Sequence, residues 1–460
     1  MCVVLVGTAF AGEPAVLGWR WDGTGRFPEA NAPATWSATQ NVIWQSATPD
    51  WSNSSPVIVA GRLFVCSEPT TLVCVDIRSG EILWKRANDY EEVFTKEEVA
   101  RAKAYQAGAK PLAEELRRQI KALKKYRKGK EPKDPAQREI FERLRTRREA
   151  LDELKKTIGT LDLLQLPPTH KANGHATPTP ATDGRYVYVL FGTGAVACYD
   201  LEGRRRWIRL LTRPTSGAGH STSPVLADGK LIVHIKDMVA LDARTDAELW
   251  RSKQDKGWGT PVVTRIGQTE VIITPRKGAI VRASDGKVLA GKTGGLEYAA
   301  PVVHEDVVYF IEKKATAWRL PETAGNTIRP ERLWESKISG NRHYASALVH
   351  DGLVYAVSND EIFTVLDASD GSKVYEKKLK MGKGKQSAYA SVTLAGGYIH
   401  VECEAGTTVV IRPGRTYQEI SRNKLEGYRS SPAFLGGRMY LRGFKHVYCI
   451  GSGTVAADAR

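Results

Sequence analysis

The sequence predicts an all-β fold: an eight-bladed β-propeller with an α-helical hairpin inserted after the first blade. Three observations lead to this prediction. A unit of four short strands recurs at intervals of about 40 residues, which is typical of propellers. The last unit lacks its fourth strand, and a strand of the same pattern stands near the N-terminus. A charged segment with helical periodicity separates the first unit from the second.

The repeat unit is clearest in the first blade. Ser54–Val65 contains a strand after a proline, a glycine turn and a second strand. Leu72–Trp84 contains a third strand that ends at Asp76 and a fourth strand that ends at Trp84. The first interval between anchors, 122 residues, includes the charged segment, and the later intervals lie between 37 and 46 residues. The eight predicted anchors are Pro56, Pro178, Pro224, Pro261, Pro301, Ala347, Val392 and Pro432.

The incomplete last unit indicates how the ring closes. It ends at Tyr448–Gly451 without a Trp strand, and Asn41–Gln45 resembles the strands that end at Trp84 and Trp250. An N-terminal strand that completes the last blade would close the ring and cover an open sheet edge. A linear solenoid is the alternative architecture, and the split terminal unit disfavours it.

The recurring Asp and Trp residues suit structural roles. Asp followed by Ser or Thr and Gly fits the turn between the third and fourth strands. A large aromatic side chain on the fourth strand can pack between neighbouring blades. Asp and Trp are eight residues apart in two blades and seven apart in a third. We therefore expect structural blade-docking roles for Asp76, Trp84, Asp200, Trp207, Asp242 and Trp250.

The inserted segment has helix signals. Thr95 followed by Glu98 is a capping box, and Asp134-Pro135 places an N-cap before a proline at the first helical position. Apolar residues recur at helical spacing on both sides of a turn signal at residues 128–132. These features predict an antiparallel helical hairpin, preceded by a shorter helix from about Lys96 to Ala107.

The inserted segment is also strongly basic. Residues 96–156 hold 20 Lys and Arg against 11 Asp and Glu, in a chain whose net charge is +16. Such a hairpin can contact an anionic surface. The alternative is a solvated helix pair whose Lys and Arg stems cover a thin apolar seam. Nucleic acid is a less favoured partner, because Tyr105, Tyr126 and Phe141 are too few aromatics for a base-stacking platform.

Composition and the N-terminus bear on location. No apolar run reaches the roughly 18 residues of a membrane-spanning helix, and 42% hydrophobic residues suffice for a core. Cys2–Ala11 is apolar and ends in Ala9-Phe10-Ala11, which resembles a secretory signal and predicts a periplasmic or otherwise exported protein. An ordinary first strand is the alternative. The predicted segments are 1–11 (signal remnant), 12–40 (N-terminal segment), 41–90 (closing strand and first blade), 91–168 (helical insertion), 169–451 (remaining blades) and 452–460 (tail).

The six cysteines predict neither a zinc site nor a disulfide framework. Cys74, Cys198 and Cys449 each stand two residues before the Asp position of their blade, or its equivalent, so we expect them to be buried on different blades. No Cys-x-x-Cys or Cys/His ligand spacing occurs. Cys66 and Cys74 flank one hairpin and form the only plausible pair, which we expect to remain reduced.

The residues before the anchors predict two rings around the propeller axis. The position directly before the anchor holds a Ser or Thr in seven of eight units, counting Thr177 in the second. The position three before is aromatic or polar, which suits a ligand or peptide platform at one mouth of the propeller. The alternative is that these side chains plug the channel. The predicted binding residues are Asn53, His175, His220, Trp258, Tyr298, His343, Tyr344, Tyr389 and Arg429. We expect no shared metal ion for the three histidines, which belong to blades two, three and six.

The units resemble the pyrroloquinoline-quinone (PQQ)-like β-propeller repeat family over roughly Asn41 to Gly451, apart from the insertion. The motif that carries the resemblance is Asp-x-x-Ser/Thr-Gly-x-x-x-Trp, as in Asp76–Trp84. The resemblance implies one of two outcomes. One is a quinoprotein dehydrogenase with the quinone on the axis and Ca²⁺ beside it. The other is a cofactor-free scaffold, like the propeller lipoprotein of the outer-membrane β-barrel assembly machinery.

The sequence departs from the dehydrogenase pattern. Quinoprotein alcohol dehydrogenases use a vicinal disulfide against the quinone, and no two cysteines are adjacent here. Glu297 is the only acid among the positions just before the anchors, whereas Ca²⁺ needs several oxygen ligands. We therefore predict a non-enzymatic binding or scaffold protein without a cofactor, which contacts a protein or small-molecule ligand. A PQQ- and calcium-dependent oxidoreductase of alcohols or sugars is the alternative.

Overall fold

The computed structural model describes residues 15–124, 134–158, 163–382 and 387–452. The predicted signal remnant, almost all of the predicted tail and the predicted turn at 128–132 lie outside these residues. The chain divides into two compact units, which are described separately below. One comprises Met1–Asn88 with Pro167–Arg460, and the other comprises Asp89–Leu166.

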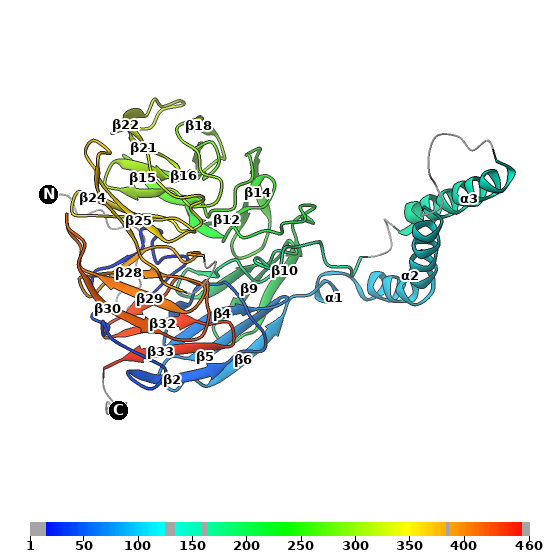
Figure 1. The fold of residues 1–460 in the computed structure, drawn as a ribbon, viewed down its shortest axis with the longest axis horizontal. Helices are drawn as coiled ribbons and strands as arrows, with labels where there is room; N and C mark the ends of the chain where they lie inside the picture. The colour runs from blue at the N-terminus through cyan, green and yellow to red at the C-terminus, as the bar shows by residue number, and fades with distance from the viewer. Residues whose placement is uncertain (1–14, 125–133, 159–162, 383–386, 453–460) are drawn as a thin grey trace. The chain divides into compact units, whose positions relative to one another are not determined.

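The first unit is an eight-bladed β-propeller, as predicted (Figure 1). Each blade is an antiparallel four-stranded sheet, and the seventh blade carries one extra strand. The first seven blades are β3–β6 (Val57–Val59, Arg62–Ser67, Thr71–Asp76, Ile82–Ala87), β7–β10 (Ala181–Thr182, Tyr186–Leu190, Ala195–Asp200, Arg205–Leu210), β11–β14 (Val225–Ala227, Lys230–His234, Met238–Asp242, Glu248–Ser252), β15–β18 (Val262–Ile266, Thr269–Ile273, Ile280–Arg282, Val288–Ala290), β19–β22 (Val302–His304, Val307–Ile311, Lys314–Arg319, Glu331–Lys337), β23–β26 (Leu348–His350, Leu353–Val357, Ile362–Asp367, Lys373–Lys378) and β27–β30 (Thr393–Ala395, Tyr398–Glu402, Thr407–Ile411, Glu419–Lys424).

The eighth blade is completed by the N-terminal part of the chain, as predicted. It contains β31–β33 (Ala433–Leu435, Arg438–Arg442, His446–Gly451) and β2 (Val42–Ala47), which pairs antiparallel with β33. Figure 1 shows β2, in blue, beside β33, in red. This pairing gives the last blade its fourth strand and joins the two ends of the propeller in one sheet.

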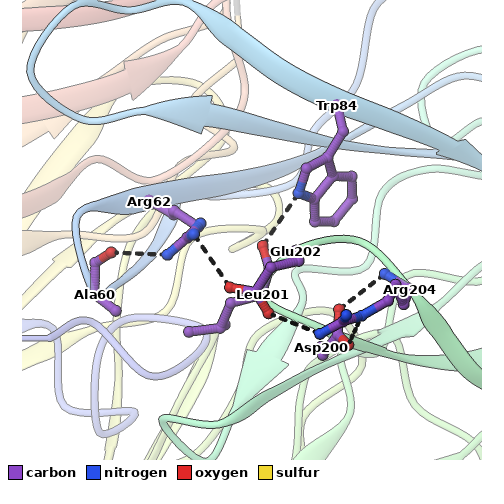
Figure 2. A network of polar contacts seen from close by, with 7 residues as sticks. All are labelled: Ala60, Arg62, Trp84, Asp200, Leu201, Glu202 and Arg204. Atoms are coloured by element: carbon purple, nitrogen blue, oxygen red, sulfur yellow. Dashed lines mark hydrogen bonds and ion pairs between the residues drawn. The ribbon is translucent and has the colours of Figure 1, made fainter.

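Neighbouring blades dock through the aromatic residue of the fourth strand. The Trp84 indole Nε1 donates to the Leu201 carbonyl at 3.1 Å (Figure 2). The Trp84 ring also lies against Gly203 of the second blade. Trp207 and Trp250 donate in the same way to Ala243 and Ala283 of the next blades. Trp334, which the sequence prediction missed, donates to Ala368 of the sixth blade.

The Asp of the repeat builds most of the turns that receive a Trp; the turn that receives Trp250 has Arg282 at that position. The Asp76 carboxylate accepts the backbone N–H groups of Arg78 and Ser79, and Asp242 accepts those of Arg244 and Thr245. Asp200 instead binds the backbone and guanidinium of Arg204, as Figure 2 shows. These bonds to the charged form lower the pKa of the three aspartates, so the turns are held by carboxylates.

The propeller closes through the same indole-to-carbonyl contact, made between its eighth and first blades. Trp44 of β2 is buried, and its Nε1 donates to the Ile77 carbonyl of the first blade at 3.2 Å. The Trp44 ring lies so close to Gly80 that a Cβ there would come within 2.6 Å of it. Only glycine can occupy that position, and it does so with a φ of +77°, which other residues adopt at a cost. The eighth blade therefore docks on the first as blades one, two, three and five dock on their neighbours.

The structure corrects the repeat register in the second blade. Its inner strand begins at Ala181, so the anchor is Pro180 rather than Pro178. The residue directly before the anchor is then Thr179, and the residue three before it is Thr177. Each lies two residues later in the chain than the sequence prediction placed it. The prediction was wrong because Thr177-Pro178 and Thr179-Pro180 are both Thr-Pro pairs, and the preceding insertion removes the spacing that would distinguish them.

Residues 15–40 cross the propeller from blade to blade. Val16 pairs with Ile58 of the first blade, and the Leu17 carbonyl accepts the N–H of Thr182 in the second. The short strand β1 (Arg26–Phe27) then pairs in parallel with β27 at the inner edge of the seventh blade. The sequence prediction assigned no role to this segment.

The second unit is helical. A short helix α1 (Tyr90–Val93) precedes α2 (Lys96–Lys124), and α3 (Pro135–Ile158) packs against α2. The predicted capping box is present, since Thr95 and Glu98 bond to each other's backbone N–H groups. The predicted separate helix from Lys96 to Ala107 was wrong, because α2 continues through Gly108 and Pro111. Four buried residues form the seam: Ala113, Ile120, Leu144 and Leu151.

The five cysteines of the described chain are buried and unpaired. Cys74, Cys198 and Cys449 each lie opposite the docking Trp of their own blade, on equivalent strands. No helix in the described ranges combines the length and apolar character needed to cross a membrane.

Candidate functional site

A cavity of about 460 Å³ opens where the chain enters the inner strands of the blades. Its volume falls within the range of about 300–1,000 Å³ found for small-molecule sites. Every blade contributes two positions to its lining: the residue directly before the anchor and the residue three before it. We call this cavity the axial cup.

The deeper position forms a ring of hydroxyl groups, which we call the hydroxyl ring. Each hydroxyl accepts the backbone N–H of the preceding ring residue, over distances of 2.9–3.1 Å. The bond from Ser431 N–H to Ser55 Oγ carries the ring across the closure between blades eight and one. Ala300 has no hydroxyl and leaves one gap. The members are Ser55, Thr179, Ser223, Thr260, Ser346, Ser391 and Ser431.

The outer position forms the rim of the cup. On blades five to eight it is a continuous aromatic and cationic ladder. Tyr298 meets Tyr344 edge to face with centroids 5.0 Å apart, and Tyr344 stacks on Tyr389 at 4.8 Å. The Arg429 guanidinium lies over Tyr389, 4.8 Å from its centroid. On the other blades the rim positions are Asn53, Thr177, Ser221 and Trp258.

Two arginines at the cup differ in how their charge is balanced. Arg429 forms an ion pair with Glu404 at 2.9 Å and also donates to the Ala172 carbonyl. Arg342, also part of the lining, donates to the Tyr344 hydroxyl at 3.2 Å and stands over the Tyr298 ring. Arg429 is therefore neutralised and holds the ladder in place, whereas Arg342 keeps its charge at the mouth.

The floor of the cup is supplied by the N-terminal segment. Trp19 lines the cavity. The residues before it in the chain form backbone hydrogen bonds to inner strands at positions after the anchors, which places the segment below the hydroxyl ring. The next residue, Arg20, is buried and donates to the carbonyls of Ala347 and Val392 at 2.8 and 2.7 Å. The segment therefore closes the cavity on the side opposite the rim.

A buried carboxyl group faces this floor segment. Glu402, on β28, is 1% exposed, and neither of its oxygens has a hydrogen-bond partner among the described residues. Burial raises the pKa of Glu402 to about 8, although the nearby Arg20 charge opposes the shift. The neutral acid is thus the favoured form below that pH.

We predict that Glu402 makes the folded protein less stable as the pH rises. The folded state binds its proton up to about pH 8, whereas the unfolded chain releases it near the ordinary value of 4.5. The contribution is fully present below that value and is lost as the pH rises through the folded pKa. E402Q should flatten this decline and exceed the wild type in stability at pH 8, measured by urea unfolding from pH 5 to 8. An unchanged slope would contradict the assignment.

Two carboxyl groups also hold the backbone that leads to an anchor, Glu68 that of the next blade and Glu312 that of its own blade. Glu68 accepts the backbone N–H groups of His175 and Ala176, and Glu312 accepts those of Glu297, Tyr298 and Ala299. Burial raises the pKa of Glu68 to about 7 and also raises that of Glu312, against these hydrogen bonds. The sequence prediction missed both residues, which follow the second strand of their blades. Aligning that slot across the repeats would have revealed them.

The structure brings six of the nine predicted binding residues into the cup. They are Asn53, Trp258, Tyr298, Tyr344, Tyr389 and Arg429. The three histidines are outside its lining. His175 leaves the rim because of the corrected register, and His220 and His343 stand one residue before rim positions, where their rings are buried. Burial lowers the pKa of His220 to about 3 and that of His343 to about 4, so both are neutral packing groups.

The lining does not fit a calcium-assisted quinone site. Ca²⁺ takes about six to eight oxygen ligands, with several carboxylates. Within the described parts of the chain, Glu297 is the single carboxylate in the lining, and it is exposed. The described residues of the chain contain no group of three or more His, Cys, Asp or Glu side chains placed to bind a metal. The cup is better suited to binding through hydroxyls, aromatic rings and cations.

Comparisons with solved structures agree on the fold. BamB from Moraxella catarrhalis matches with a TM-score of 0.55 at 12% identity, over 89% of this chain and 99% of that one. The quinohemoprotein alcohol dehydrogenase from Comamonas testosteroni matches with a TM-score of 0.57 at 11% identity, over 97% and 82%. A europium-containing methanol dehydrogenase gives 0.55 at 12%, over 92% and 89%. At these identities the likeness shows the fold alone.

The sequence itself matches a family model. No curated protein matches the chain. The model, described as outer membrane protein assembly factor BamB, matches residues 33–110 and 156–377, which is well over half of the chain. The matched residues include the closing strand and most of the blades. The chain therefore belongs to the PQQ_2 family, that of the outer membrane protein assembly factor BamB.

Proposed function

We propose that this protein is an exported, non-enzymatic propeller that binds a partner through the axial cup, with the helical unit as a second contact element. The observation that carries the proposal is the cup itself. All eight blades contribute an aromatic or polar residue to its rim, and the N-terminal segment closes its floor. A cup of this kind admits a ligand from one side only.

The chemistry of the lining supports binding rather than turnover. A stacked tyrosine ladder gives a large contact area with few rotatable bonds, as at many interfaces. The hydroxyl ring is engaged in holding the blades together, which keeps the site rigid. Membership in the family of an assembly factor is consistent with a scaffold role, and the apolar N-terminal residues support export to the periplasm.

Quinone binding distinguishes this proposal from an oxidoreductase. When the full chain is incubated with micromolar PQQ and Ca²⁺, we expect no bound quinone absorbance and no dye-linked oxidation of alcohols or sugars. The reason is that the lining lacks a carboxylate set for the metal. Stoichiometric quinone binding with turnover would overturn the non-enzymatic assignment.

The helical unit presents its charge to solvent. Its apolar seam is buried between α2 and α3, and ion pairs such as Arg143–Glu139 use part of the charge. Other basic residues are exposed and take part in no ion pair with the described chain. Four of these are Arg101, Arg117, Lys121 and Arg148. We propose that this unit contacts an anionic surface through exposed basic residues such as these.

Neutralising these four residues tests the second contact. The variant R101Q/R117Q/K121Q/R148Q should retain the thermal midpoint of the wild type, because the side chains are exposed. Its binding to vesicles containing anionic lipid should fall by about a hundredfold or more at low salt, since each basic residue contributes about 1 kcal/mol near such a surface. Vesicle co-sedimentation measures this. Unchanged binding, or binding that salt does not weaken, would eliminate the arm as an anionic contact.

A further inference from the structure

The axial cup holds an excess of hydrogen-bond donors. Each of the seven hydroxyls in the hydroxyl ring accepts a backbone N–H. None of them donates its own hydrogen to an acceptor within the described residues. A hydroxyl hydrogen rotates to suit its surroundings, so these groups can donate to a ligand in the cup. Such a ring favours a ligand with several acceptor oxygens.

The charge at the mouth favours an anionic ligand. Arg342 forms no ion pair with the described residues, and Lys256 lies 5.9 Å from the centroid of the rim residue Trp258. Glu297 is the single carboxylate among the described lining residues, and Arg429 is already paired with Glu404. An anion entering the cup would therefore meet a guanidinium that forms no ion pair with the described chain before it reaches the hydroxyls.

The rim residue Asn53 is fixed by its own side-chain hydrogen bonds. The Asn53 amide nitrogen donates to the Ala172 carbonyl at 2.7 Å and to the Thr177 hydroxyl at 2.8 Å. Its Oδ1 atom is buried and has no partner among the described residues. A ligand in the cup cannot reach this buried oxygen, so Asn53 shapes the rim. The tyrosine ladder of blades five to seven adds a broad contact area for aliphatic groups. A ligand that joins carboxylate oxygens to aliphatic stems over several residues, as an acidic peptide does, matches both the donors and the ladder.

We propose that the axial cup binds a carboxylate-bearing peptide segment of a partner. The carboxylate lies between Arg342 and the hydroxyl ring, and the tyrosine ladder covers the aliphatic part of the segment. This inference rests on the proposed function and names the ligand of the same site. The shared chemistry is a carboxylate, which a small dicarboxylic acid could also provide.

Calorimetric titration of the full chain with three probes tests the proposal. The probes are N-acetylated tetraglutamate amide, the matching tetraglutamine amide, and free glutarate. We expect the glutamate peptide to bind at least about tenfold more tightly than the glutamine peptide, because charge-assisted hydrogen bonds are the stronger ones. It should also bind more tightly than glutarate, because only the peptide is long enough to cover the tyrosine ladder as well.

Variants locate the charge. R342Q should weaken the glutamate peptide about tenfold, E297Q should strengthen it, and R244Q should leave it unchanged, because Arg244 is exposed in the turn between β13 and β14. Arg342 and Arg244 are both exposed arginines, so the thermal midpoint should not move in either variant.

Each alternative result has a defined meaning. Equal binding of the glutamate and glutamine peptides, abolished by Y344A, would overturn the carboxylate assignment while the cup remains a binding site. Glutarate binding as tightly as the peptide would overturn the peptide assignment. If no probe binds while partner capture still depends on Tyr344, the inference fails and the proposed function stands.

Discussion

Replacing Trp44 by alanine is expected to lower the free energy of unfolding by about 3–5 kcal/mol, the usual cost of truncating a buried aromatic side chain. Trp44 is buried at the junction of the eighth and first blades and bonds to the Ile77 carbonyl. The loss should therefore open the ring at its closure rather than loosen a single blade. Urea unfolding of the full chain measures it.

A glycine substitution in the first blade tests the same junction, and a second glycine substitution serves as its control. G80A adds a Cβ within 2.6 Å of the Trp44 ring at a φ of +77°, so it should cost about 2–4 kcal/mol from overpacking and backbone strain. G61A is the matched control. Its φ is +69°, but nothing lies within 4 Å of the added atom, so only about 1–2 kcal/mol is expected. If W44A costs no more than L83A, an exposed truncation on β6, the closure does not depend on this contact.

Replacing Tyr344 by alanine should weaken partner binding by about 30-fold or more, which corresponds to about 2 kcal/mol for a central aromatic anchor. Tyr344 stands between Tyr298 and Tyr389 and also receives the Arg342 hydrogen bond. Its removal breaks the ladder at its middle and frees Arg342. Y344F keeps the stack and should lose about fivefold, the value of one hydrogen bond.

The control for Y344A is Y398A. Tyr398 is partly buried at the start of β28, outside the cup lining, and receives an arginine over its ring as Tyr298 does. Both variants lose a partly buried tyrosine, so thermal unfolding shows whether their stabilities are comparable. Binding affinity measured by calorimetry should fall for Y344A alone. Equal affinities for the two variants would remove the ladder from the binding surface.

The fold could be predicted from the sequence because the repeat carries physical constraints that repeat with it. A turn Asp, a glycine under a ring and a docking Trp recur at fixed spacing, and Val42–Ala47 supplies the missing fourth strand of the eighth blade. The register in the second blade could not be fixed in this way. Two successive Thr-Pro pairs satisfy the same pattern, and only the pairing of Ala181 with Tyr188 decides between them.

The cup was only partly predictable. Counting back from the anchors identified Tyr298, Tyr344 and Tyr389, because an ordered repeat brings equivalent positions to one axis. The floor could not be found by counting, since Trp19 and Arg20 lie outside the repeats. Their positions depend on tertiary bonds to blades far along the chain. Arg342 lies five residues before its anchor, where the loops differ between blades.

Site-specific photocrosslinking tests most directly whether the axial cup is the contact surface. A photoreactive phenylalanine derivative is placed at Tyr344 in the rim or at Leu249, an exposed position on the outer strand β14. In cells that express the full chain, we predict a crosslinked partner from position 344 and none from position 249. Crosslinking from position 249 alone would place the contact on the outer face of the propeller and contradict the account.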